Sequence, residues 1–273
     1  MNEILSNIEL EQSAVDAFQR DGVVLLKGVF SNWVDTLRAG IDQNMRDPGE
    51  YGKNYTKEGQ SGQFFGDYCN WQRIPEYRDF FFDSPAAELT SQLLGSETVQ
   101  IFHEHVLVKE PGTAQKTPWH HDQPYYCVDG EKMCSLWIPL DPVEQSVCPE
   151  FIAGSHKWGK WFVPTKFTGA SYTRDGDNMQ PIPDIDAQRD EYDIKSWTLE
   201  PGDCIAFHFL TVHGAPENLS SHRRRAFSAR LMGEDARFAV RGGEMSPPFP
   251  GLEKRLQPGM AMQADEFPVI FPQ

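Results

Sequence analysis

The chain has 273 residues, of which 39% are hydrophobic and 24% are charged, a composition typical of a folded globular protein. Lys and Arg number 25 against 40 Asp and Glu, so the formal net charge is −15 at pH 7. A field of this sign repels nucleic-acid phosphates and anionic lipid surfaces, which argues against both as partners. No apolar run approaches the roughly 18 residues that a membrane span needs, and no basic start leads into an apolar stretch. We therefore expect a cytoplasmic protein.

The N-terminal part of the chain predicts helices around one short strand. Apolar residues in Glu9–Arg20 and Trp33–Met45 have helical spacing, and the first segment ends at a glycine. Val23–Leu26 lies between them and reads as a buried strand, while Pro85–Leu94 predicts a further helix. Residues from 1 to about 96 are therefore expected to form a helical buttress.

From about residue 97 onward, short strand-like runs alternate with Pro and Gly turns. The predicted strands are Thr98–Val108, Met133–Leu140, Ile194–Leu199, Asp203–Phe209 and Arg225–Met232. This pattern favours a mainly β fold with flanking helices, namely a double-stranded β-helix (a cupin-like jelly roll) over residues 97–235.

The organisation predicted for the whole chain is one domain spanning 1–273, because no repeat or low-complexity linker divides it. A Pro-rich C-terminal segment, with Pro247, Pro248 and Pro250, is expected to be extended on the surface. Thr165–Asp193 shows no periodicity and is long for a connection, so we expect a mobile lid.

One short motif has the residue types and spacing of a metal site. If Trp119–Asp122 is a strand, His120 and Asp122 share a face while His121 points away. A distant histidine, with His213 as the candidate, would complete two imidazoles and one carboxylate. That ligand set suits non-haem Fe(II), because it leaves coordination positions open.

Several motifs in order resemble the phytanoyl-CoA dioxygenase family of Fe(II)- and 2-oxoglutarate-dependent oxygenases. The matching segments are Trp119-His120-His121-Asp122, Trp137-Ile138-Pro139-Leu140, Gly154-Ser155-His156, and His213 followed eleven residues later by Arg224. Asp21–Val29 resembles the N-terminal strand of the family, so the similarity runs from about Phe18 to Met232.

The resemblance implies that His120, Asp122 and His213 bind iron and form the catalytic centre. It implies that Arg224 binds the distal carboxylate of 2-oxoglutarate and that Trp137 lines the cosubstrate pocket, with Thr117 as a further cosubstrate contact. Some relatives place a serine two residues after the distal histidine, where this chain has Ala215. The implied reaction consumes O2 and 2-oxoglutarate, releases succinate and CO2, and hydroxylates a small organic molecule.

Contacts with that small-molecule substrate are expected from a wider set of residues, namely Tyr125, Tyr126, Asn70, Gln63, Arg73 and His105. His103 and His105 share one face of a predicted strand and could line the cavity or, by their spacing, bind a metal. Two alternative functions stay open at this point. One is a metal-dependent enzyme of cupin type that is not an oxygenase, and the other is a metal-binding module without turnover. The sequence leaves the oligomeric state open.

Overall fold

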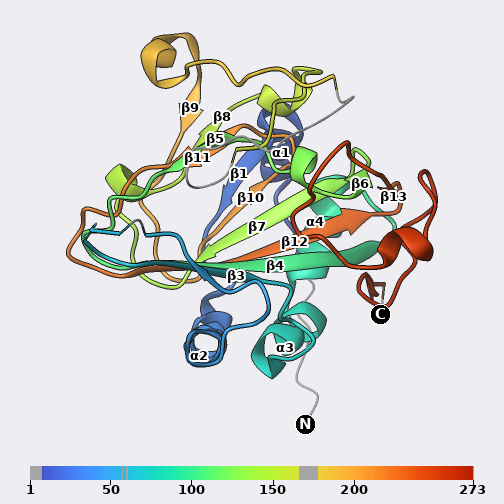
Figure 1. Ribbon diagram of the computed structural model, residues 1–273, viewed down its shortest axis with the longest axis horizontal. Helices are drawn as coiled ribbons and strands as arrows, with labels where there is room; N and C mark the ends of the chain where they lie inside the picture. Colours follow the sequence, from blue (N-terminus) through green and yellow to red (C-terminus); the bar gives the residue numbers. More distant parts are fainter. Residues whose placement is uncertain (1–7, 57, 60, 166–177, 273) are drawn as a thin grey trace.

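The computed structural model describes residues 8–56, 58–59, 61–165 and 178–272. Its strands pair antiparallel, and most of them belong to two sheets that lie one above the other (Figure 1). The larger sheet has the order β1-β10-β7-β12-β4-β3-β2, with β14 beside β4. Its strands are β1 (Val23–Leu26), β2 (Lys53–Asn54), β3 (Phe64–Tyr68), β4 (Val99–Lys109), β7 (Met133–Pro139), β10 (Cys204–Phe207), β12 (Arg224–Gly233) and β14 (Val269–Phe271).

The smaller sheet has the order β5-β11-β8-β9 and is the upper layer in Figure 1. It consists of β5 (Thr117–His120), β8 (Glu150–Ile152), β9 (Ile194–Lys195) and β11 (His213–Ala215), and a separate pair joins β6 (Val128–Asp129) to β13 (Arg237–Phe238). Two facing antiparallel sheets with helices against one of them form the jelly roll that the sequence predicts.

The helices cover the face of the larger sheet that points away from the smaller one, as α2 and α3 do in Figure 1. They are α1 (Gln12–Asp21), α2 (Val34–Arg46), α3 (Pro75–Asp83) and α4 (Ala86–Leu94). Alternation along β12 creates this arrangement, because Phe227, Ala229 and Leu231 pack into the helix-side core while Arg224 and Ser228 face the other way. The larger sheet therefore has an apolar outer face, and its inner face carries both apolar and polar side chains.

Each predicted helix and strand overlaps one in the structure, but further elements were not predicted. β1 has the predicted bounds, and α1 ends where Gly22 adopts a left-handed φ of 73° and its N–H donates to the Phe18 carbonyl. The predicted helical buttress describes residues 1–96 incompletely, because β1 pairs with β10 and β3 pairs with β4 inside the larger sheet. Sequence analysis did not identify β3 or α3, although Pro75 at the first turn of α3 is a typical start signal.

The Pro-rich C-terminal segment is not the extended surface segment that was expected. Pro247 is buried, and the residues after it pack into a second core around Phe102. β14 then adds to the larger sheet beside β4.

The predicted lid, 165–193, falls partly on residues 166–177, which lie outside the described residues. Beyond them, Ile185 is buried and a 3-10 helix covers Asp186–Glu191. Among the described residues, no helix has the length and apolar character that crossing a bilayer requires.

Candidate metal centre and cavity

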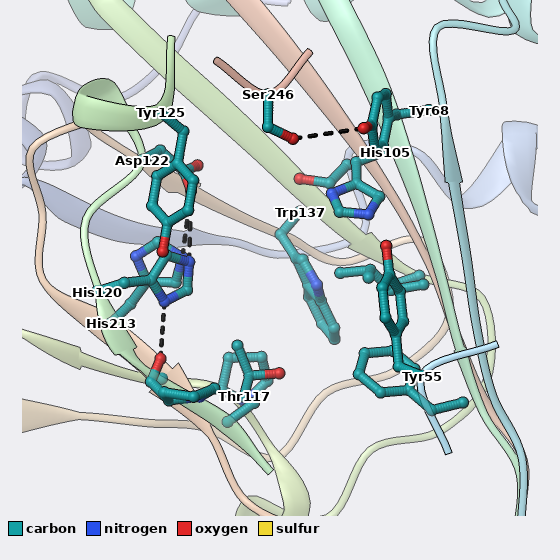
Figure 2. A pocket seen from close by; sticks show the side chains of 18 of the residues that line it. Tyr55, Tyr68, His105, Thr117, His120, Asp122, Tyr125, Trp137, His213 and Ser246 are labelled. Carbon is teal, nitrogen blue, oxygen red and sulfur yellow. Dashed lines mark hydrogen bonds and ion pairs between the residues drawn. The ribbon is translucent and has the colours of Figure 1, made fainter. Parts of the chain in front are cut away.

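A cavity of about 580 Å³ opens between the two sheets and contains most of the predicted site residues. Figure 2 shows His120, Asp122 and His213 on one side of it, Tyr55, Tyr68 and His105 on the other, and Trp137 between them. The predicted residues that line it are Thr117, His120, Asp122, Tyr125, Tyr126, Trp137, His105, His213 and Arg224. This volume suits a small organic ligand.

Three of the predicted substrate contacts do not line this cavity. Gln63 is exposed just before β3, whereas Asn70 is buried and accepts a hydrogen bond of 2.7 Å from Arg73 Nε. The Arg73 guanidinium also donates to the Asp47 carbonyl, at 2.6 Å. These contacts tie Asn70 and Arg73 to the loop after α2, so the turn that carries them faces away from the cavity.

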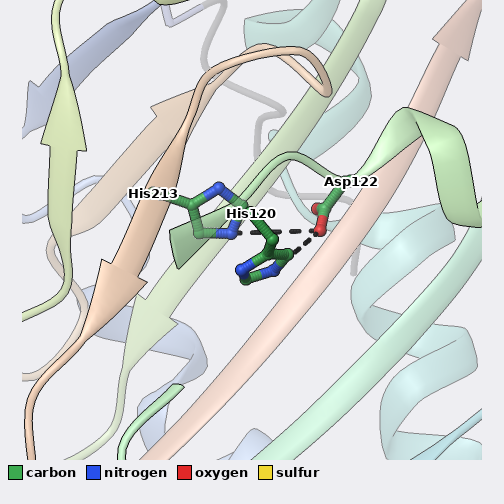
Figure 3. Close-up of side chains that lie close together, drawn as sticks. All are labelled: His120, Asp122 and His213. Carbon is green, nitrogen blue, oxygen red and sulfur yellow. Dashed lines mark ion pairs between the residues drawn. The ribbon is translucent and has the colours of Figure 1, made fainter. Parts of the chain in front are cut away.

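The three predicted metal ligands come together in the cavity wall (Figure 3). His213 on β11 is the direct antiparallel partner of His120 on β5, and their ring centroids are 4.2 Å apart. One carboxylate oxygen of Asp122 lies 3.5 Å from His120 Nε2 and 3.9 Å from His213 Nε2. One potential ligand atom from each residue lies within 4.8 Å of the others.

The position of Asp122 differs from the strand alternation expected from the sequence. β5 ends at His120, and Asp122 has helical φ and ψ of −74° and −42° at the start of a 3-10 turn (Gln123–Tyr125). Its backbone N–H donates to the Phe209 carbonyl at 2.8 Å, which fixes the turn. His121 does point away, as predicted, because its Nε2 accepts a hydrogen bond of 2.9 Å from the Phe162 N–H.

Both imidazoles are held in the tautomer that a metal ligand needs. His120 Nδ1 lies 2.8 Å from the Pro118 carbonyl, and His213 Nδ1 lies 2.9 Å from the Thr211 carbonyl. A carbonyl only accepts, so each Nδ1 carries the proton when the imidazole is neutral, and each Nε2 presents a lone pair. Two nitrogen lone pairs and a carboxylate oxygen therefore converge with no hydrogen between them, which fits a bound divalent cation.

The charges around Asp122 keep this carboxylate ionised. Burial favours its protonated form, but Arg230, 3.3 Å away, and the two histidines hold the pKa of Asp122 well below its usual range. Burial and the neighbouring His120 lower the pKa of His213 to about 3, so this imidazole is neutral at pH 7. The site thus presents an ionised carboxylate beside the neutral imidazole of His213.

At another part of the cavity wall, two buried cations lie side by side. Lys109 on β4 and Arg224 on β12 are direct partners in the antiparallel register, and both line the cavity. Lys109 Nζ donates to the Pro216 carbonyl at 3.1 Å and Arg224 donates to the Val147 carbonyl. Within the described part of the chain, neither forms an ion pair with a carboxylate. The sequence predicted Arg224 but not Lys109.

The neighbouring arginines lie outside the cavity, as strand alternation predicts. Arg223 pairs with Glu110 at 2.7 Å, and Arg225 pairs with Asp141 at 2.8 Å. Arg225 is nonetheless more buried than a surface arginine, because its side chain is only 14% exposed.

The C-terminal segment supplies cavity residues that sequence reasoning missed. Glu244, Ser246 and Pro247 line the cavity, and the Ser246 N–H donates to the Tyr125 carbonyl at 2.9 Å. The Ser246 hydroxyl donates to the Tyr68 hydroxyl at 3.4 Å (Figure 2). Only the return of the chain across the cavity brings these residues there, so no local sequence signal marks them.

Comparison with solved structures shows relatives of the same fold. A 2-oxoglutarate-dependent carbocyclase, SnoK from nogalamycin biosynthesis, superimposes with a TM-score of 0.75 at 21% identity, over 98% of this chain and 100% of the other. EctD from S. alaskensis, solved with 2-oxoglutarate and 5-hydroxyectoine, superimposes with a TM-score of 0.67 at 20% identity, over 92% of this chain and 85% of the other.

Comparison with curated sequences shows relatives of one family. A phytanoyl-CoA dioxygenase of Arabidopsis thaliana is 29% identical over 162 residues, which are 59% of this chain and 54% of that protein. Phytanoyl-CoA dioxygenase 1 of Oryza sativa subsp. japonica is 26% identical over 165 residues, which are 58% of this chain and 53% of that protein. The chain thus spans about half the length of these curated relatives. Residues 18–226 match the phytanoyl-CoA dioxygenase (PhyH) family as a whole, and the chain belongs to that family.

Proposed function

We propose that this protein is a non-haem Fe(II)- and 2-oxoglutarate-dependent dioxygenase that hydroxylates an unactivated C–H bond of a small organic molecule. One observation carries the proposal. A single cavity holds a cluster of two histidines and one aspartate and also two buried basic residues that have no carboxylate partner among the described residues. A metal-dependent enzyme that uses no dicarboxylate cosubstrate has no need of the second feature.

His120, Asp122 and His213 would hold the iron through two nitrogens and one oxygen, an arrangement that leaves coordination positions for other ligands. Bound Fe(II) supplies O2 activation coupled to the oxidative decarboxylation of 2-oxoglutarate to succinate and CO2. The backbone carbonyls at Pro118 and Thr211 orient the two imidazoles toward the metal.

Arg224 would bind the distal carboxylate of 2-oxoglutarate, because a planar guanidinium suits a carboxylate. Lys109 would supply the second interaction that a serine provides in some relatives. Its ammonium group already reaches the Pro216 carbonyl, next to Ala215. Trp137 and Thr117 line the same cavity and would flank the cosubstrate.

Tyr125 would help to close the cavity over bound ligands. Its hydroxyl donates to the Thr165 carbonyl at 2.7 Å and accepts from the Thr165 N–H at 2.8 Å, and both residues line the cavity. This double contact ties the chain at Thr165 to the part of the cavity wall near His120, whose ring centroid is 5.8 Å from that of Tyr125. Closure of this kind excludes water from a reactive centre.

The test is anaerobic reconstitution with Fe(II) and 2-oxoglutarate, followed by exposure to O2 and a metabolite screen for compounds that stimulate succinate formation. A sample loaded with Zn(II) is the matched control. Succinate that depends on iron and O2 supports the proposal. Bound metal without succinate under any condition contradicts it and leaves a non-oxygenase enzyme of cupin type or a metal-binding module.

A further inference from the structure

The wall of the cavity away from the metal cluster carries a continuous row of polar side chains. Tyr68 on β3 is the register partner of His105 on β4, and His105 is the partner of Ser228 on β12. All three line the cavity, and we call them the polar row. Ser228 is in turn the register partner of Trp137, which Figure 2 shows between the metal cluster and His105. The row thus extends across the larger sheet toward the proposed iron site.

Polar atoms in and beside this row are buried without hydrogen-bond partners. Within the described residues, His105 Nε2 and Ser228 Oγ have none, and the same holds for His103 Nδ1, two residues along β4. His103 and Ser228 are only 2% and 1% exposed. Buried polar groups are satisfied in the great majority of cases, so three unsatisfied groups together require an explanation. Because their side chains line a cavity, a ligand is the natural source of partners.

The row carries no ionic charge that a charged ligand could pair with. Burial, reinforced by Arg230, lowers the pKa of His105 to about 3, and the same two causes hold the pKa of His103 well below its usual range. Arg230 is the nearest cation on β12, but Asp122 at 3.3 Å and the Tyr126 hydroxyl at 2.5 Å already engage it. An ionised group placed against the row would lose its water without gaining a countercharge from the row itself.

We propose that the polar row is the substrate-recognition surface and that it binds an uncharged molecule bearing hydroxyl or carbonyl groups on a largely apolar body. This inference rests on the proposed function for the identity of the metal cluster that faces the substrate. Neutral imidazoles and a hydroxyl can each donate or accept, so they suit such groups in either role. The aromatic rings of Tyr55, Tyr68 and Trp137 supply the apolar contact (Figure 2).

The test uses three fluorescent probes on one ring system, namely 1,5-dihydroxynaphthalene, unsubstituted naphthalene and naphthalene-1,5-disulfonate. Each is titrated against the whole protein, anaerobically, both without additions and with Fe(II) and 2-oxoglutarate. We expect the dihydroxy probe to bind most tightly. With Fe(II) and 2-oxoglutarate present, so that the cosubstrate occupies Lys109 and Arg224, equal binding of all three or tighter binding of the disulfonate overturns the inference.

Two variants test whether the preference for the dihydroxy probe arises from the polar row. His105→Phe keeps an aromatic ring against Tyr68, and Ser228→Ala removes only the hydroxyl. Each variant is expected to weaken binding of the dihydroxy probe about three- to tenfold and to leave binding of naphthalene unchanged. The matched control is His222→Phe, at an exposed position outside the cavity. The inference is overturned if neither variant loses more affinity for the dihydroxy probe than the control does.

Two further measurements separate recognition from a structural role and from the proposed function. If His105 serves recognition, replacing its unsatisfied nitrogen leaves the melting temperature of the free protein unchanged or higher, whereas a structural role predicts a decrease. The probe preference does not require iron. If the protein prefers the dihydroxy probe but never forms succinate, only the proposed function is contradicted. If the protein forms succinate but shows no such preference, only this inference is contradicted.

Discussion

Lys109 and Arg224 face each other across β4 and β12, and each directs its charged group to a backbone carbonyl rather than to a carboxylate. Burial, together with the neighbouring Arg224, lowers the pKa of Lys109 to about 6, and burial lowers that of Arg224 to about 10. Two protonated groups side by side in a buried site are unfavourable without an anion, which is why the pKa of Lys109 falls. A negatively charged ligand would restore the proton, so this pair is arranged for such a ligand.

Arg224→Ala is predicted to raise the KM for 2-oxoglutarate by about two orders of magnitude. Removing one partner of a buried charge pair costs about 3–5 kcal/mol, which corresponds to at least a hundredfold in affinity. Succinate production measured against 2-oxoglutarate concentration gives the KM directly. An unchanged KM would remove Arg224 from the cosubstrate site.

Arg223→Ala and Arg225→Ala are the controls for that experiment, since both lie outside the cavity. Arg223 is an exposed partner of Glu110, so its loss should change the free energy of unfolding by no more than about 0.5 kcal/mol. Arg225 makes two hydrogen bonds to Asp141, at 2.8 and 3.0 Å, so its loss should reduce stability while leaving the KM unchanged. Arg225 is therefore a partly buried residue that contributes to stability and not to cosubstrate binding.

The lowered pKa of Lys109 predicts that the affinity for 2-oxoglutarate depends on pH. In the free protein its pKa is about 6, and a bound carboxylate would raise that value. Between the two pKa values binding takes up a proton, so the KM for 2-oxoglutarate should rise as the pH increases above about 6. Lys109→Met should raise the KM about tenfold at pH 6 and flatten the dependence. An identical pH profile in wild type and variant would show that Lys109 does not contact the cosubstrate.

The metal cluster predicts a contrast between adjacent histidines. His120→Ala, Asp122→Ala and His213→Ala should each lose bound iron, measured as metal content after reconstitution. His121→Ala should retain the iron, because its ring faces Phe162 instead of the cluster. It should still lower the free energy of unfolding by about 1–3 kcal/mol, since the Phe162 N–H is left buried without an acceptor. Loss of iron in His121→Ala with retention in His120→Ala would contradict the assignment.

Local sequence signals were sufficient for the parts of the site that lie within one short segment. His120 and Asp122 are two residues apart, so the motif identified them even though Asp122 lies in a turn after β5 and not on the strand. The family resemblance implied roles for His213 and Arg224. Alternation along β12 accounts for Arg224 lining the cavity while Arg225 pairs with Asp141 outside it.

Residues that depend on long-range pairing were not predictable in this way. Lys109 becomes a cavity cation only because β4 pairs with β12 in one particular register. Ser246 arrives from a segment that crosses back over the cavity. Asn70 does not line the cavity for a similar reason, because it is held by hydrogen bonds to Arg73 and to Glu104. Single-sequence patterns carry no information on such contacts.

Glu104→Gln is predicted to change how stability depends on pH. Glu104 is fully buried on the helix side of β4, where its carboxyl oxygens accept from the N–H groups of Asn70 and Trp71 at 2.6 and 3.2 Å. Burial raises the pKa of Glu104 to about 8, partly offset by these hydrogen bonds. The folded state therefore holds a proton that the unfolded state releases above about pH 4.5, so this group lowers the free energy of unfolding as the pH rises from about 4.5 to about 8.

The neutral amide of glutamine removes this titration. Its NH2 group cannot accept from a backbone N–H as both carboxyl oxygens of Glu104 do, so the variant also loses stability by an amount that does not depend on pH. Relative to wild type, the variant should gain stability progressively between pH 5 and pH 8, measured as the difference between urea unfolding curves at each pH. The matched control is Glu110→Gln, at a half-buried carboxylate near the end of the same strand that pairs with Arg223. Its replacement should give no such gain. A constant difference between Glu104→Gln and wild type across this range would mean that Glu104 is already ionised in the folded protein.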